Sequence, residues 1–193
     1  PSFDQDFYNF TWNCPNQSVN VSFAGYADSI PGIFTLGSTG PLDGSNIPRY
    51  LITPGGSVFY GYYLSTGGLY DLTNGGSAAR TINIGNDFVL NGGRFYQSAN
   101  AIGTLSVGGN YTINSGVHVI GRTSGSNTTV GRDFLMTGGY FRVTYDQSGT
   151  LTVLGNFSLT GGTFNMSDAA LPGVLNLAGN FTFTAGDITE TGT

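Results

Sequence analysis

The chain has 193 residues, enough for a single domain with a sizeable core, and only 9% of them are charged. Glycine accounts for 32 residues, but 39% of the residues are hydrophobic, which excludes a disordered Gly-rich segment. The formal net charge of -5 makes nucleic acid an unexpected partner, and no apolar run is long enough to span a membrane.

The sequence pattern of residues 1–76 predicts that they form the first, irregular turns of a coil. The stretches 7–13 and 18–26 alternate apolar and polar residues and are expected to form the first strands. Residues 32–40 resemble a repeat lengthened by one residue, and residues 61–72 have the spacing of residues 155–166. Residues 41–57 contain three prolines and a Gly-Gly pair, so we expect this segment to leave the coil as an excursion.

Residues 77–193 are built from regular repeats of about 23 residues. An aromatic residue recurs in them at Phe88, Tyr111, Phe134, Phe157 and Phe181, and Tyr63 occupies the same position in the irregular part before them. Five residues after each aromatic stands a glycine: Gly68, Gly93, Gly116, Gly139, Gly162 and Gly186. Apolar residues alternate with polar ones on both sides of the aromatic position, the pattern of short strands with one buried face.

This repeat predicts an all-β fold in which short strands stack on their own counterparts. A propeller blade of about 40 residues has four strands and does not fit the period, whereas one rung of a parallel β-helix does. We therefore expect residues 1–193 to form one right-handed parallel β-helix (β-solenoid) of six or seven rungs. The aromatic column should form a stack in the core, and the glycine column should supply the turns.

The repeat motif G-x-L-x-V-x-G-N-F-x-L-x-x-G-x-F and the opening FYNFTWNCPNQSVNVSFAGY resemble repeat regions of large secreted surface proteins of Bacteroidota, of the kind exported by the type IX system. The resemblance implies an extracellular or cell-surface location and a role in an adhesin or a filament. The segment Asp-Ser-Ile at 28–30 also fits the pattern that such bacteria O-glycosylate, which makes Ser29 a candidate glycosylation site and the chain a candidate glycoprotein.

Because pectin-degrading enzymes are parallel β-helices, we ask whether two acidic residues could lie close enough to form a catalytic pair. Glycoside hydrolysis uses two carboxylates about 5 to 9.5 Å apart. Asp87 and Asp133 share one column, but two rungs would separate them by roughly 10 Å. The full column is Asp87, Asn110, Asp133, Asn156 and Asn180, which we interpret as a stack at a corner whose side chains bond to the local backbone.

The remaining reactive residues predict neither a metal site nor a cofactor. Cys14 and His118 are the only residues of their kinds, which excludes an internal disulfide and a pair of histidine ligands. His118 either replaces a core aromatic or is turned outward by a shift of one residue. With no lysine in the chain, only an arginine could serve as the base of a lyase. We therefore expect no catalytic, cofactor-binding or metal-binding residue and no enzymatic activity.

Three hypotheses about function remain. The first is a non-enzymatic structural repeat protein that forms an extracellular fibre, filament or adhesin stalk on a bacterial surface. The alternatives are a carbohydrate-binding solenoid, whose outward Thr, Asn and Ser columns would face glycans, and a carbohydrate-active, pectin-lyase-like enzyme. The last repeat keeps its full pattern to within a few residues of Thr193. We therefore expect either end-to-end self-association or continuation of a longer solenoid.

Overall fold

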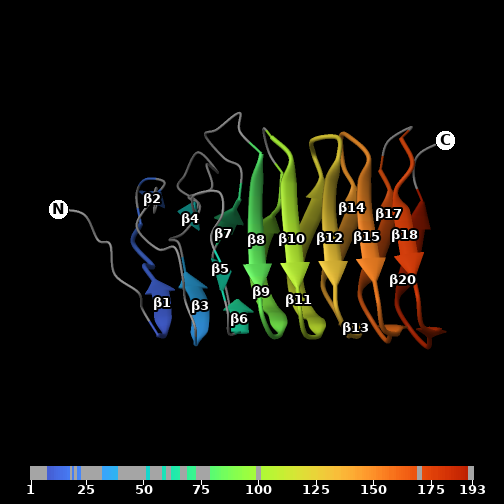
Figure 1. Ribbon diagram of the computed structural model, residues 1–193, viewed down its shortest axis with the longest axis horizontal. Helices are drawn as coiled ribbons and strands as arrows, with labels where there is room; N and C mark the ends of the chain where they lie inside the picture. The colour runs from blue at the N-terminus through green and yellow to red at the C-terminus, as the bar shows by residue number, and fades with distance from the viewer. Residues whose placement is uncertain are drawn as a thin grey trace.

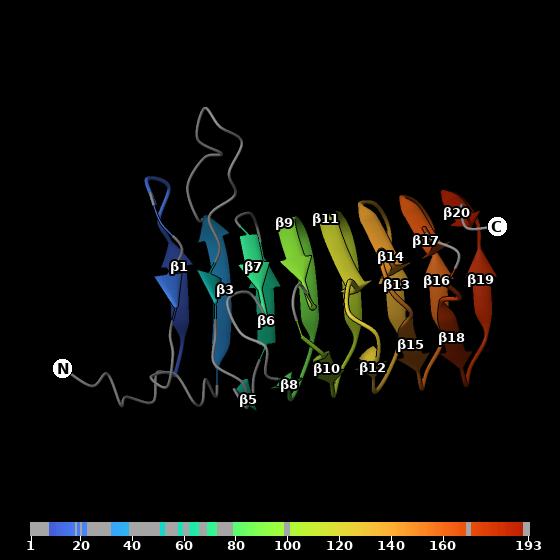
Figure 2. The ribbon, with the colours of Figure 1, turned by 90° about the horizontal axis from the view of Figure 1, so that it is seen from above.

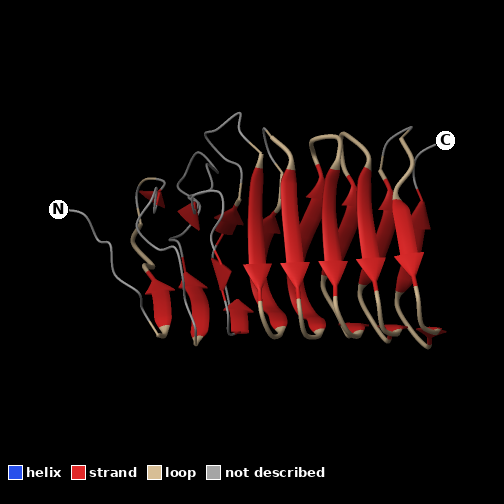
Figure 3. Ribbon diagram, in the orientation of Figure 1, coloured by secondary structure: helices blue, strands red, loops and turns tan. Residues whose placement is uncertain are grey.

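The structure is a computed structural model, and it describes residues 8–17, 19, 21–22, 32–38, 51–52, 58–59, 62–65, 69–72, 79–98, 101–168 and 171–190. These residues form strands and the turns between them, without a helix (Figure 3). None of them therefore belongs to a helix that could cross a membrane. Gly68, Ser29 and most of the segment 41–57 lie outside the described residues.

In the described part of the chain, twenty strands form two parallel sheets. The larger sheet contains β1 (Phe10–Asn13), β2 (Val21–Ser22), β3 (Ile33–Ser38), β4 (Leu51–Ile52), β6 (Tyr62–Ser65), β7 (Leu69–Asp71), β9 (Phe88–Tyr96), β11 (Tyr111–Gly121), β13 (Phe134–Met136), β14 (Tyr140–Thr144), β16 (Phe157–Leu159), β17 (Thr163–Ser167), β19 (Phe181–Phe183) and β20 (Asp187–Glu190). The smaller sheet contains β5 (Val58–Phe59), β8 (Arg80–Ile84), β10 (Gly103–Val107), β12 (Ser126–Val130), β15 (Gly149–Val153) and β18 (Val174–Leu177).

Each strand pairs in parallel with the equivalent strand one turn away, which confirms the predicted solenoid. Gly103 of β10 pairs with Arg80 of β8, and Ser126 of β12 pairs with Gly149 of β15. Five complete turns run from β8 to β20, against the six or seven rungs expected, and β1, β3 and β6 extend the larger sheet toward the N-terminus. The coil is right-handed: in Figure 1 the front strands β8, β10, β12, β15 and β18 run downward while the chain advances from N to C.

The two sheets enclose the core from opposite sides. Figure 2 shows β8, β10 and β12 along one edge of the coil and β9, β11, β14 and β17 along the other. β9 and β11 are long strands that supply two faces of a turn, whereas later turns divide the same path between two strands, such as β13 and β14. Each turn thus contributes three inward-facing strand segments, and the core is a column inside the coil.

The aromatic column predicted from the repeat runs through this core in register. Tyr63 pairs with Phe88, and the pairing continues through Tyr111, Phe134, Phe157 and Phe181. Ring centroids of successive residues from Phe88 onward are 4.3, 5.0, 4.7 and 5.1 Å apart. Stacked and edge-to-face rings at these distances are each worth about 0.5 to 1.5 kcal/mol beyond their burial.

The last aromatic of this column departs from the expected burial. The rings from Phe88 to Phe157 are fully buried, whereas Phe181 is 45% exposed. Phe181 keeps its register with Phe157 on β16. In the described part of the chain no strand pairs with β19 on its other side, so the outer face of the Phe181 ring has no neighbour from a following turn.

The glycine column occupies the turns for a conformational reason. Gly93, Gly116, Gly139, Gly162 and Gly186 all have positive φ, from 73° to 98°. A side chain is also blocked sterically, since a Cβ on Gly162 would lie 2.5 Å from the backbone carbon of Gly138. Only glycine combines this backbone conformation with so close an approach of successive turns.

The N-terminal strands join the same coil. β1 pairs with β3 and β3 with β6, so the stretches expected to form the first turns belong to the larger sheet. β4, which lies within the expected excursion, pairs with β2 and β7. Leu51 and Ile52 thus lie in the parallel ladder, and the other residues of the expected excursion lie outside the described residues.

Candidate functional site

The Asx column is a ladder that links successive turns through their backbone. Asp87 Oδ1 accepts a hydrogen bond from the backbone N–H of Asn110 at 2.6 Å, and Asp133 Oδ1 accepts one from Asn156 at 2.7 Å. Asn110 and Asn156 accept in the same way from Asp133 and Asn180. The expectation of bonds to the local backbone is wrong, because each of these side chains accepts from a backbone N–H of the next turn, which would otherwise need another partner.

These bonds give the acidic residues a structural role that can be tested by substitution. We expect Asp133→Ala to lower the free energy of unfolding by about 1 kcal/mol, because the Asn156 N–H loses its acceptor. Asp133→Asn should leave stability nearly unchanged, because an amide oxygen keeps that acceptor, as at Asn110. Urea unfolding of both variants measures the difference. Equal losses in the two variants would contradict the ladder.

His118 lies in the core and takes the place of an aromatic in a second column. It pairs with Phe95 on one side and Phe141 on the other, and its side chain is fully buried. Its ring is edge-on to both phenylalanines, with centroids 5.0 and 4.9 Å away. Of the two orientations left open by the sequence, the inward one is therefore observed.

The imidazole of His118 is held by a closed set of buried hydrogen bonds. Its Nδ1 contacts the hydroxyl of Tyr111, and its Nε2 lies 3.2 Å from Gln97 Oε1. Thr128 donates to the same Gln97 oxygen at 2.6 Å, and Gln97 Nε2 donates to the Gly103 carbonyl at 2.8 Å. A neutral ring with its proton on Nε2 satisfies every one of these groups, with the Tyr111 hydroxyl as donor to Nδ1.

Burial lowers the pKa of His118 from 6.5 to about 3, because the charged imidazolium would lose its hydration without gaining a carboxylate partner. The described residues also contain no group of three or more His, Cys, Asp or Glu side chains that could hold a metal ion. The network around His118 therefore acts as a polar element of the core, closed to solvent.

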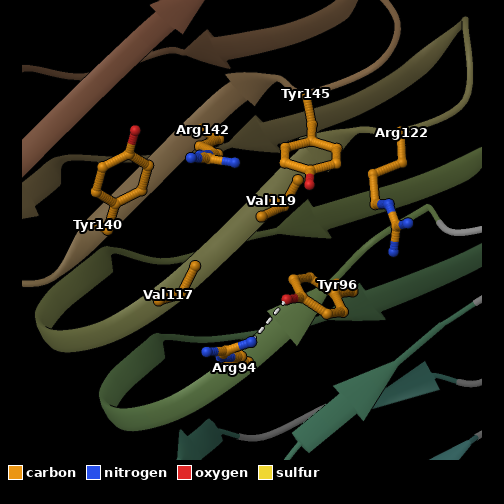
Figure 4. A pocket seen from close by; sticks show the side chains of 8 residues that line it. All are labelled: Arg94, Tyr96, Val117, Val119, Arg122, Tyr140, Arg142 and Tyr145. Carbon is orange, nitrogen blue, oxygen red and sulfur yellow. Dashed lines mark hydrogen bonds between the residues drawn. The ribbon is translucent and has the colours of Figure 1, made fainter. Parts of the chain in front are cut away.

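A groove on the outside of the larger sheet was missed by the sequence analysis. It has a volume of about 530 Å³ and crosses three turns, on β9, β11 and β14 (Figure 4). Val117 and Val119 of β11 form its floor. Its walls come from Arg94, Tyr96, Tyr140 and Arg142, and Arg122 and Tyr145 lie at one end.

The groove arises from a difference in side-chain size between neighbouring turns. Val117 pairs with Arg94 and with Tyr140, so one outward column is large, small, large along the axis. Val119 pairs in the same way with Tyr96 and Arg142. Since these residues stand one and three positions after the turn glycines, comparing those outward positions between repeats would have found the groove.

The arginines of the groove are held against tyrosine rings. The guanidinium carbon of Arg142 lies 4.8 Å from the Tyr140 ring centre and 4.9 Å from that of Tyr145, and Arg122 lies 5.4 Å from Tyr145. Arg94 Nη1 donates to Tyr96 Oη at 3.2 Å. Such cation–π contacts fix the direction of long side chains that would otherwise be free to rotate.

Acidic residues balance part of this positive charge. Arg142 Nε lies 2.8 Å from Asp168, and Arg122 Nε lies 3.9 Å from the exposed Asp146. Burial opposes the charge of Arg142, but the hydrogen bond to Tyr140 and the negative charge of Asp168 outweigh burial and raise its pKa. Arg142 thus keeps its proton, which suits it to binding an anion rather than to accepting a proton.

The outward polar columns bond along the axis as well. Asn114 Nδ2 donates to Asn91 Oδ1 at 2.7 Å, and Thr137 Oγ1 donates to Asn114 Oδ1 at 2.7 Å. Their polar groups are thus engaged in part with one another, one turn above the next. Ser29 and Gly68 lie outside the described residues, so the candidate glycosylation site has no structural description.

Comparison with protein-family models, curated proteins and solved structures found no significant match to this chain.

Proposed function

We propose that the chain is a non-enzymatic structural repeat protein that forms part of an extracellular fibre, filament or adhesin stalk on a bacterial surface. The observation that carries this proposal is the end of the solenoid at β18, β19 and β20. Phe181, Phe183 and Ile188 are 45%, 50% and 48% exposed there, although their counterparts in the preceding turn are buried. In the described part of the chain no strand follows this apolar rung, and it fits the stacking of a further turn, either of a longer solenoid or of a second copy.

The internal ladders support the same role. Aromatic rings, Asx side chains and outward polar side chains contact their counterparts one turn away, so equivalent contacts join successive turns along the axis. The extracellular bacterial setting is supported by the resemblance of the repeat motif to large secreted surface proteins of Bacteroidota. The cationic groove supports a second candidate function on the same solenoid, the binding of carbohydrate.

End-to-end association can be tested with a charge on the exposed rung. We expect the chain to associate into elongated particles and Phe181→Arg to stay monomeric, because an arginine at this face opposes apolar stacking. Leu135→Arg is the matched control, since Leu135 is an exposed apolar residue on the side of the coil. Analytical ultracentrifugation and negative-stain images measure the outcome. A native chain that stays monomeric at every concentration would overturn the proposed association.

A further inference from the structure

The groove over β11 concentrates positive charge on an acidic protein. It gathers three of the six arginines, Arg94, Arg122 and Arg142, in a chain of net charge -5. In the described part of the chain Arg94 has no carboxylate partner, and Asp146, the partner of Arg122, is exposed and 3.9 Å away. The groove thus brings several guanidinium groups together on one described face, which would attract an anionic ligand.

The shape and lining of the groove narrow the class of ligand. The floor is apolar, and the flanking strands stand two strand spacings apart, about 10 Å. Tyrosine rings offer flat faces to C–H groups, and their hydroxyls can donate to and accept from sugar hydroxyls. A planar guanidinium matches a carboxylate with two parallel hydrogen bonds.

We propose that the groove lined by Arg94, Arg122, Arg142, Tyr96 and Tyr140 over the floor of Val117 and Val119 binds a saccharide that carries carboxylate groups. This proposal rests on the second candidate function, carbohydrate binding. It does not depend on end-to-end association, because every lining residue belongs to one chain. The sugar ring lies over Val117, the half-buried valine of the floor, and the guanidinium groups hold its carboxylates.

The test is a calorimetric titration of the full chain with hexagalacturonate and, separately, with its fully methyl-esterified form. We expect the acidic form to bind more weakly as salt is raised, and the ester not to bind. Arg94→Gln and Arg122→Gln should each weaken binding at least about tenfold. Val117→Phe should abolish binding by filling the groove without changing its charge, and circular dichroism checks that each variant is folded.

Arg132→Gln is the matched control, because Arg132 is an exposed arginine at a corner outside the groove and its loss changes the net charge equally. Equal binding of the ester, equal weakening by Arg132→Gln, or no binding of hexagalacturonate by the native chain would overturn the proposal. Binding of inorganic phosphate as tight as that of hexagalacturonate would overturn the saccharide class. The same titration on Phe181→Arg separates ligand binding from association, so that either property can fail alone.

Discussion

Lowering the pH from 7 to 4.5 is expected to reduce the free energy of unfolding by about 2.5 kcal/mol through His118 alone, given its native pKa of about 3 and its ordinary value of 6.5. Between these two values the unfolded chain binds a proton at His118 and the folded chain does not. Stability therefore falls as the pH drops below 6.5, by about 1.4 kcal/mol per pH unit, and the fall ends near pH 3. Above pH 6.5 the residue is neutral in both states and contributes no pH dependence.

A double variant isolates this contribution from that of the carboxylates. In the variant Tyr111→Phe with His118→Phe, both positions carry phenylalanine, as Phe134 and Phe141 do one turn on. The buried Tyr111 hydroxyl is thus removed together with its partner, the imidazole of His118. Replacing both partners with apolar groups of similar shape costs little at neutral pH. Urea unfolding at pH 7 and 4.5 should show a smaller loss in the double variant, by about 2.5 kcal/mol. Equal losses in the two proteins would show that His118 is accessible to protons in the folded state.

Phe134→Ala is expected to lower the free energy of unfolding by about 3 to 5 kcal/mol, because it opens a cavity in the middle of the aromatic column. The Phe134 ring is fully buried, with centroids 5.0 Å from Tyr111, 4.7 Å from Phe157 and 5.2 Å from Phe141. The surrounding turns cannot collapse into the space, because the backbone ladders fix their spacing.

Phe181→Ala is the matched control, as it removes the same side chain from the same column where the ring is 45% exposed. Its cost should be well under half of that of Phe134→Ala, since less apolar surface returns to water and no enclosed cavity forms. Denaturant unfolding of monomeric protein measures both variants. A loss as large at Phe181 as at Phe134 would contradict the idea that enclosure inside the coil decides the cost.

The regular part of the fold could be predicted because parallel stacking places each residue against its own counterpart. A period of about 23 residues is therefore visible in the sequence, and Phe134, at the centre of the repeats, shows its inward position through the alternation around it. The glycine column was equally visible, since a positive φ such as the 82° of Gly162 admits almost no other residue.

Three features of the molecule could be recognised only in the structure. Alternation of apolar and polar residues did not show whether His118 or the valines on either side of it face the core, so both orientations remained open. The Asx column was visible, but the sequence does not show that Asp133 accepts from the N–H of Asn156, one turn on, rather than from its own turn. The groove exists because Val119 is smaller than the residues paired with it on β9 and β14. This difference in size can be recognised only when the register of β11 with both strands is known.

The parallel ladders have a mechanical consequence for a chain that is pulled from its ends. Their hydrogen bonds, such as that from Gly131 to Val107, join one turn to the next along the axis. Tension along the axis therefore loads the ladders by peeling, one turn after another, rather than by shearing all of them together. A freed turn of about 23 residues extends to about 80 Å, against about 5 Å in the coil. We therefore expect the solenoid to lengthen in steps under load, with each step releasing one turn.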